Sequence, residues 1–236
     1  MRGTVFDWDG TLVDIDEREF YCINQALTEH GTSGISQEFY VQNYYQRPFE
    51  VGSGPRMVIE TALEQDMGRA DRVYESYRRL FASTVDRVRL HEGALQLLKL
   101  LNGEGLKVGI ATMRFTRSVV ASEIKVLGVD SWTNIFLTRE DLGFDKRLGS
   151  LDETVDQRAR LVTKVLAKLD VSIAESFLVG DSWWDVRAGK KLGMKTVLVK
   201  TGFSYYNDFS SEKPDLLVGS LPELEARIRS GELDNS

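Results

Sequence analysis

Apolar residues recur along this chain with two different periods, and the change between them divides the sequence into two regions. From residue 16 to about residue 86 they follow the spacing of amphipathic helices, as in Phe20, Ile23 and Leu27. We find no convincing strand pattern in that stretch. From about residue 87 onward, short apolar runs such as 107–113 (KVGIATM) alternate with helix-like segments. The chain therefore combines an all-helical region with a region of alternating strands and helices.

The turn and capping residues give approximate limits for these elements. In the helical region, a first helix ends at His30-Gly31 and Ser36 caps a second, while a third and a fourth centre on 57–63 and 73–85. Beyond residue 87, the helices are expected at 94–101, 117–127, about 153 or 157 to 169, 184–192 and 221–228. The strands are expected at 107–113, 134–138, 176–179, 195–199 and 215–218, after an opening strand that ends near Phe6.

Alternating strands and helices predict an α/β fold class with a doubly wound parallel sheet. We expect residues 1–15 and 87–236 to form this Rossmann-like core, with residues 16–86 inserted as a second, helical domain. In such folds the ligand site lies beyond the carboxyl ends of the strands.

Two acidic residues follow the opening strand. Val5 and Phe6 end a buried strand, the chain turns at Gly10, and Asp7 and Asp9 lie two residues apart between them. In an extended segment such residues point to the same side, and two close carboxylates repel unless a cation neutralises them or one is protonated. Asp-Gly is also a common turn dipeptide, so this segment alone does not separate a turn from a site.

Polar residues also end two later strands. Thr112 ends the 107–113 run, and Asp181 follows the 176–179 run, with Asp185 one helical turn later. Each has a structural alternative, because Asp caps helix N-termini and Thr112 could simply end its strand. Together with Asp7 and Asp9, these groups indicate a site for a hard cation such as Mg²⁺.

The composition narrows the possible functions. The 236 residues carry 30 basic and 36 acidic side chains, a net charge of −6, which argues against a nucleic-acid partner. Two histidines and one cysteine, Cys22, argue against zinc and exclude an internal disulfide. We expect no signal peptide and no membrane partner, because an acid occurs already at position 7 and no run approaches the ~20 apolar residues that span a bilayer. The expectation is a cytoplasmic protein.

The motifs DWDGT at 7–11, GIATM at 109–113 and GDSWWD at 180–185 resemble motifs one, two and four of the haloacid dehalogenase-like hydrolase superfamily. The resemblance covers nearly the whole chain. The helical region is similar to the mobile cap of its phosphoglycolate phosphatase-like and beta-phosphoglucomutase-like members.

The resemblance implies a role for each site residue. Asp7 would be the nucleophile that forms an aspartyl-phosphate, and Asp9 would protonate the leaving oxygen and then activate water. Asp7, Asp181 and the backbone carbonyl of Asp9 would hold Mg²⁺, with support from Asp185. Thr112 would bind a phosphoryl oxygen.

The third family motif, a lysine or arginine ahead of motif four, is ambiguous here. Counting back from Asp181 lands on Asp156, with Arg158 as the nearest cation. Counting forward along 141–146 (DLGFDK) reaches Lys146, followed by an insertion of about ten residues. We favour Lys146 and retain Arg158 as the alternative, and either could be a solvated surface charge.

The predicted function is a Mg²⁺-dependent phosphatase of a small phosphorylated metabolite. A phosphomutase of the same fold and an inactive member with a binding or regulatory role are the alternatives, whereas dehalogenases lack the acid at the position of Asp9. The sequence leaves open the substrate, the choice between monomer and homodimer, and the roles of Arg47 and of Tyr40, Tyr44 and Tyr45 in the helical region.

Overall fold

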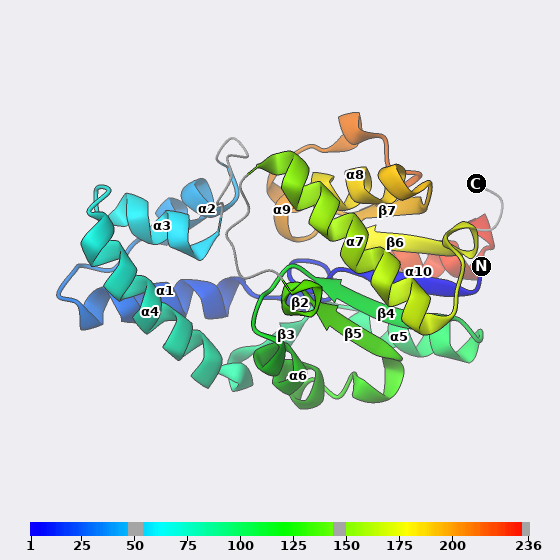
Figure 1. Cartoon of the computed structure of the whole chain (residues 1–236), viewed down its shortest axis with the longest axis horizontal. Coiled ribbons are helices and arrows are strands. Elements are labelled where there is room, and N and C mark those ends of the chain that lie inside the picture. Colours follow the sequence, from blue (N-terminus) through cyan, green and yellow to red (C-terminus); the bar gives the residue numbers. More distant parts are fainter. Residues whose placement is uncertain (47–53, 144–149, 233–236) are drawn as a thin grey trace. The chain divides into compact units, whose positions relative to one another are not determined.

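The computed structural model describes residues 1–46, 54–143 and 150–232. The chain forms two compact units: the first consists of Met1–Asp14 and most of the chain from Arg89 onward, and the second spans Ile15–Val88 (Figure 1). Each unit has its own buried core and is described separately.

A six-stranded parallel sheet forms the centre of the first unit, in the order β5-β4-β1-β6-β7-β8. Its strands are β1 (Gly3–Phe6), β4 (Lys107–Thr112), β5 (Ile135–Thr138), β6 (Ser176–Gly180), β7 (Lys195–Val199) and β8 (Leu216–Val218). β1 lies between β4 and β6, where Val5 is in register with Gly109 and Leu178. The predicted doubly wound parallel sheet is confirmed, and each strand lies within two residues of its expected range.

Helices cover both faces of this sheet. They are α5 (Ala94–Gly103), α6 (Arg117–Val126), α7 (Leu151–Leu169), α8 (Trp183–Leu192), α9 (Gly202–Tyr206) and α10 (Leu221–Arg229). α5 and α6 lie on one face, where α10 also contacts α5, and α7 and α8 lie on the other (Figure 1). Because both faces are covered, β1 and β6 are buried along their whole length, which explains why their sequences contain no charged residue.

α7 approaches the sheet closely at one glycine. A side chain at Gly109, in the middle of β4, would collide with Val165 of α7. This close packing fixes the rotation of α7 against the sheet and determines which of its residues face inward.

Short elements complete the first unit. β2 (Val13–Asp14) and β3 (Arg89–Leu90) pair antiparallel where the chain leaves and re-enters it. This pair was not predicted, because two-residue strands are too short to show a period. Single 3₁₀ turns occur in this unit at Asp130–Trp132, Arg139–Leu142, Ile173–Glu175 and Ser210–Glu212, and another occurs in the second unit at Val85–Arg87.

The second unit is helical among its described residues. It contains α1 (Asp16–Glu29), α2 (Gln37–Tyr44), α3 (Pro55–Ala62) and α4 (Met67–Ser83). α1 packs against α4 and α3, and buries Ile23 and Leu27 in this contact. The Ser36 hydroxyl accepts a hydrogen bond from the Phe39 N–H at 3.1 Å, so the predicted cap of α2 is present.

No described helix combines the length and apolar character needed to cross a membrane.

Candidate active site

Three neighbouring strands deliver polar side chains to one edge of the sheet. Asp7 directly follows β1, Thr112 is the last residue of β4, and Asp181 directly follows β6. The Asp7 N–H donates to the Val179 carbonyl at 2.9 Å, which continues the β1–β6 ladder one residue past the strand. Since β4, β1 and β6 are adjacent and parallel, their carboxyl ends meet at this edge.

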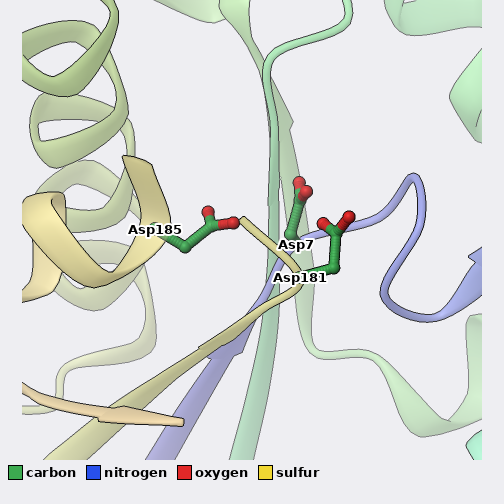
Figure 2. A group of neighbouring side chains, drawn as sticks. All are labelled: Asp7, Asp181 and Asp185. Atoms are coloured by element: carbon green, nitrogen blue, oxygen red, sulfur yellow. The ribbon is translucent and has the colours of Figure 1, made fainter. Parts of the chain in front are cut away.

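Three carboxylates form a buried cluster there. Asp7, Asp181 and Asp185 each have an oxygen within 4.8 Å of the others, and Figure 2 shows Asp185 reaching toward the other two from the first turn of α8. Their relative exposures are 8%, 1% and 2%. Among the described residues, no histidine or cysteine joins this cluster, so its donor set is oxygen alone.

The electrostatics of the cluster fit a divalent cation. Burial, together with the charges of Asp185 and Asp9, raises the pKa of Asp7 to about 7, against the opposing effect of Arg158. Burial and the charges of Asp7 and Asp185 likewise raise the pKa of Asp181 well above its usual range. Two such groups, Asp7 and Asp181, resist ionisation together unless a cation balances them, and hard oxygen donors are the ligands of Mg²⁺.

Arg158 is a fully buried cation within the cluster. Its Nη1 lies 3.0 Å from Asp7 Oδ1, its Nη2 lies 2.5 Å from Asp185 Oδ1, and it donates to the Ala111 carbonyl. The structure therefore brings Arg158 into the site, two turns inside α7 rather than ahead of that helix. Lys146, the cation favoured by the sequence, lies outside the described residues.

Asp181 is held by backbone and side-chain donors that the sequence analysis missed. The Phe203 N–H donates to its Oδ2 at 2.6 Å, and the Thr11 hydroxyl to its Oδ1 at 3.2 Å. Gly202, with φ of +42°, lies so close to the Asp181 carboxylate that a side chain there would collide with it. The available signal was Thr201-Gly202, which lies two residues past β7 where α9 begins.

Asp185 serves as a helix cap and an ionic partner at once. One of its oxygens accepts from the Ser182 hydroxyl and, at 3.3 Å, from the Ser182 N–H, in a capping box. The other oxygen pairs with Arg158. The capping alternative considered for this segment is thus present without removing Asp185 from the cluster.

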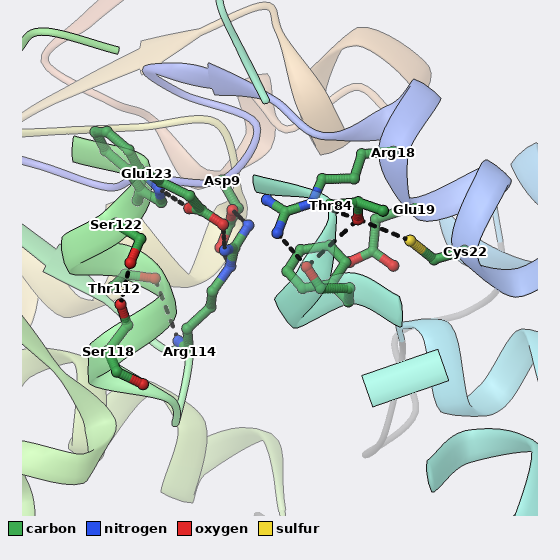
Figure 3. Close-up of polar contacts among 12 residues, drawn as sticks. Asp9, Arg18, Glu19, Cys22, Thr84, Thr112, Arg114, Ser118, Ser122 and Glu123 are labelled. Atoms are coloured by element: carbon green, nitrogen blue, oxygen red, sulfur yellow. Dashed lines mark hydrogen bonds and ion pairs between the residues drawn. The ribbon is translucent and has the colours of Figure 1, made fainter. Parts of the chain in front are cut away.

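The Asp9 carboxylate has a partner of its own. Both of its oxygens accept from the Arg114 guanidinium, with Arg114 Nε 2.8 Å from Asp9 Oδ2 (Figure 3). The Thr112 hydroxyl accepts from the Arg114 N–H at 3.2 Å. Sequence reasoning missed Arg114, although its position two residues beyond Thr112 places it at the same strand end.

Comparisons with known proteins agree with this geometry. Residues 4–199 match the family model for haloacid dehalogenase-like hydrolases. The chain is 25% identical over 228 residues to a protein named pyrophosphatase PpaX from Halalkalibacterium halodurans, with 95% of each chain covered. It is 28% identical over 224 residues to a protein named phosphoglycolate phosphatase from Psychrobacter arcticus, covering 89% of this chain and 88% of the other.

Solved structures show the same fold. A predicted phosphoglycolate phosphatase from Haemophilus somnus aligns with a TM-score of 0.76 at 17% identity, covering 95% of this chain and 96% of the other. A haloacid dehalogenase-like hydrolase from Streptococcus pneumoniae aligns with a TM-score of 0.71 at 16% identity, covering 97% and 98%. As the resemblance of its motifs predicted, the chain belongs to the haloacid dehalogenase-like hydrolase family.

Proposed function

We propose that this chain is a Mg²⁺-dependent phosphatase that hydrolyses a small phosphorylated metabolite through an aspartyl-phosphate on Asp7. The observation that carries the proposal is the cluster of Asp7, Asp181 and Asp185 around the buried Arg158. The relatives named pyrophosphatase and phosphoglycolate phosphatase cover 95% and 89% of the chain, which supports phosphoric ester or anhydride substrates.

Mg²⁺ would be held by Asp7, Asp181 and the backbone carbonyl of Asp9, with Asp185 in support. When bound, it would neutralise charge on the phosphoryl oxygens and let an anionic nucleophile approach them. The buried, closely spaced carboxylates provide the oxygen donors that this role needs.

The protein groups would carry out two displacements at phosphorus. In the first, an Asp7 oxygen bonds to phosphorus, the bond to the leaving oxygen breaks, and Asp9 gives that oxygen a proton. In the second, water attacks phosphorus and gives its proton to Asp9, and phosphate leaves as the Asp7 carboxylate is restored. The Thr112 hydroxyl, at the end of β4, would donate to a phosphoryl oxygen.

Arg158 is proposed as the cation of the third family motif. Its contact with Asp7 Oδ1 fixes the rotamer of the nucleophile and leaves the other oxygen for attack. Its second contact, with Asp185, ties the nucleophile to the start of α8. Lys146 remains a prediction for the same role.

The helical unit, predicted from the sequence as residues 16–86, is proposed as a cap that selects the substrate and excludes water. Its place in the chain supports this assignment. The unit is inserted between β2 and β3, directly after the segment that carries Asp7 and Asp9.

Turnover of an aryl phosphate by the Asp7→Asn variant tests the proposal. We expect a loss of more than about 1,000-fold, because the amide cannot act as the nucleophile. Asp130→Asn, at an exposed aspartate far along the chain, is the matched control and should keep full activity. EDTA should abolish turnover and Mg²⁺ should restore it.

A panel of phosphorylated metabolites, scored by phosphate release with and without Mg²⁺, then narrows the substrate class. Pyrophosphate, 2-phosphoglycolate and sugar phosphates belong in the panel. Full turnover by Asp7→Asn, or turnover unaffected by EDTA, would contradict the proposal, and rearrangement of a sugar phosphate without phosphate release would favour a mutase.

A further inference from the structure

Asp9 is connected to the interior of its unit by a chain of charged and polar contacts. Arg114 donates to both Asp9 oxygens and also pairs with Glu123 Oε1 (Figure 3). The other Glu123 oxygen, Oε2, accepts from Trp8 Nε1 at 2.8 Å. These four residues come from the DWDGT turn, the segment after β4, and α6, and they form what we call the Asp9 brace: Trp8, Asp9, Arg114 and Glu123.

Burial decreases along the brace toward Asp9. The relative exposure of the side chain is 0% for Glu123, 14% for Arg114 and 22% for Asp9. A carboxylate as buried as Glu123 is costly without partners, and here both of its oxygens have one. The guanidinium is thus held from its buried side by Glu123 while it presents Nε and Nη2 to Asp9.

A guanidinium that contacts both oxygens of a carboxylate fixes the orientation of the carboxylate more strictly than a single hydrogen bond does. Each carboxylate oxygen has two lone pairs, so Asp9 can still accept a proton while Arg114 holds it.

We infer that Arg114 is a positioning residue that aims the Asp9 carboxylate for proton transfer, with Glu123 and Trp8 holding Arg114 in place. This inference rests on the proposed function, because it assigns the brace a part in the Asp9 step. The balance of that step is unchanged: the water proton goes to Asp9, the hydroxide bonds to phosphorus, and the bond from phosphorus to Asp7 breaks.

Arg117 provides a matched comparison. It lies three residues further along, at the start of α6, and pairs with Asp141 Oδ2 at 2.7 Å and the Phe136 carbonyl at 3.2 Å. It is 38% exposed. Arg114 and Arg117 thus share a chemical type and a region of the chain, but only Arg114 contacts Asp9.

The test compares the steady-state kinetics of Arg114→Met and Arg117→Met on an aryl phosphate with Mg²⁺ present. We expect Arg114→Met to lower kcat about 100-fold, within the range of a lost proton-transfer group, with KM changed less than about twofold. Arg114→Lys should recover part of the loss, since it restores the charge without the two-pronged contact. Arg117→Met should match the wild type.

A double-mutant cycle shows whether Arg114 acts through Asp9. If it does, Asp9→Asn and the double variant Asp9→Asn/Arg114→Met should have equal kcat, because the group being positioned is already lost. Three results would each overturn the inference. They are kcat losses that multiply in the double variant, an unchanged kcat in a folded Arg114→Met, and a raised KM at constant kcat.

Further measurements distinguish a failure of this inference from a failure of the proposed function. If circular dichroism shows that Arg114→Met does not fold, Glu123→Gln replaces it in the same cycle. We expect Glu123→Gln to lower kcat in the otherwise wild-type protein and to leave kcat unchanged in the Asp9→Asn background. Losses that multiply would overturn the inference. Full turnover by Asp9→Asn would contradict the proposed function itself. A slow Asp9→Asn beside a fast Arg114→Met would contradict only the inference.

Discussion

Buried ionisable groups have different neighbours in the two units of this protein. In the α/β unit, Asp7, Asp181 and Asp185 crowd together around Arg158. One guanidinium pairs with Asp7 and Asp185, so negative charge remains in excess in the cluster. Burial and this excess charge raise the pKa of Asp7 to about 7. This arrangement opposes folding stability and favours the binding of a cation and a phosphoryl group.

In the helical unit, several buried or half-buried ionisable groups contact neutral donors and acceptors, while the buried Glu60 pairs with Arg56 Nε at 2.7 Å. Glu19 accepts from the Tyr77 hydroxyl at 2.6 Å, and Asp16 accepts from the Tyr40 hydroxyl at 3.2 Å. Arg18, fully buried, donates to the Phe81 carbonyl and lies 3.8 Å from the centre of the Phe81 ring. Such pairs satisfy each polar group locally.

The comparison teaches that burial of charge does not by itself identify a site. What distinguishes the α/β unit is like charge held together where parallel strands end. Changes to the charges of this buried cluster should therefore alter turnover and metal binding, whereas changes to buried polar groups of the helical unit should alter stability alone.

Arg158→Met should give the largest effect of the changes that test this comparison. We expect kcat to fall about 1,000-fold or more, the scale of arginines that stabilise phosphoryl transfer. The variant also leaves Asp7 and Asp185 without their shared cation, at a cost of about 3–5 kcal/mol in the free energy of unfolding. Steady-state kinetics and thermal melts measure the two losses.

Two further variants sharpen this result. Arg158→Lys keeps a charge and should recover part of both losses, while Arg160→Met, at an exposed position on the same helix, should match the wild type. Wild-type turnover by a folded Arg158→Met would show that Arg158 is not the cation of the third motif. Lys146→Met would then be the next variant to measure.

Mg²⁺ should stabilise the protein more as pH rises. The pKa of Asp7 is raised from 3.8 to about 7, so in the metal-free protein its favourable contribution is complete below pH ~3.8 and is lost as pH rises through ~7. Mg²⁺ competes with that proton and binds better once it is gone.

At saturating Mg²⁺ this predicts a rise in Tm of about 5–10 °C at pH 8 and a smaller rise at pH 6. Melts at both pH values, with and without EDTA, measure it, and Asp7→Asn should reduce the pH dependence. A Tm shift of equal size at pH 6 and pH 8 would show that Asp7 does not lose a proton when the metal binds.

The strands and the carboxylates at their ends could be predicted because the signals are local. Asp7 and Asp181 directly follow apolar runs, and parallel strands bring such residues to one edge of the sheet. The start of α7 could not be predicted closely, because its first turn is polar and resembles a loop. The sequence therefore did not decide between Lys146 and Arg158 as the cation of the third motif, because Arg158 faces the site only when α7 has its observed rotation.

The partners of these groups could not be predicted from periodicity. Asp9 and Arg114 are 105 positions apart, and Thr11 reaches Asp181 across 170 positions. A charged residue just past a strand shows no pattern that distinguishes a surface arginine from one held by a buried Glu123. Only the register of β1 between β4 and β6 brings such residues together.

Tyr77→Phe should give the smallest effect and tests the helical side of the comparison. Burial and the Glu19 carboxylate raise the pKa of Tyr77 well above its usual range, so its hydroxyl stays a donor at physiological pH. Removing it leaves Glu19 without that donor, at a cost of about 1–3 kcal/mol in the free energy of unfolding, with kcat changed less than about twofold.

Tyr74→Phe, whose ring stacks on Tyr77 from the same helix, is the control and should lower Tm less. A 10-fold loss of kcat in Tyr77→Phe at unchanged Tm would mean that Glu19 acts on the substrate, and charge in the helical unit would then be functional as well.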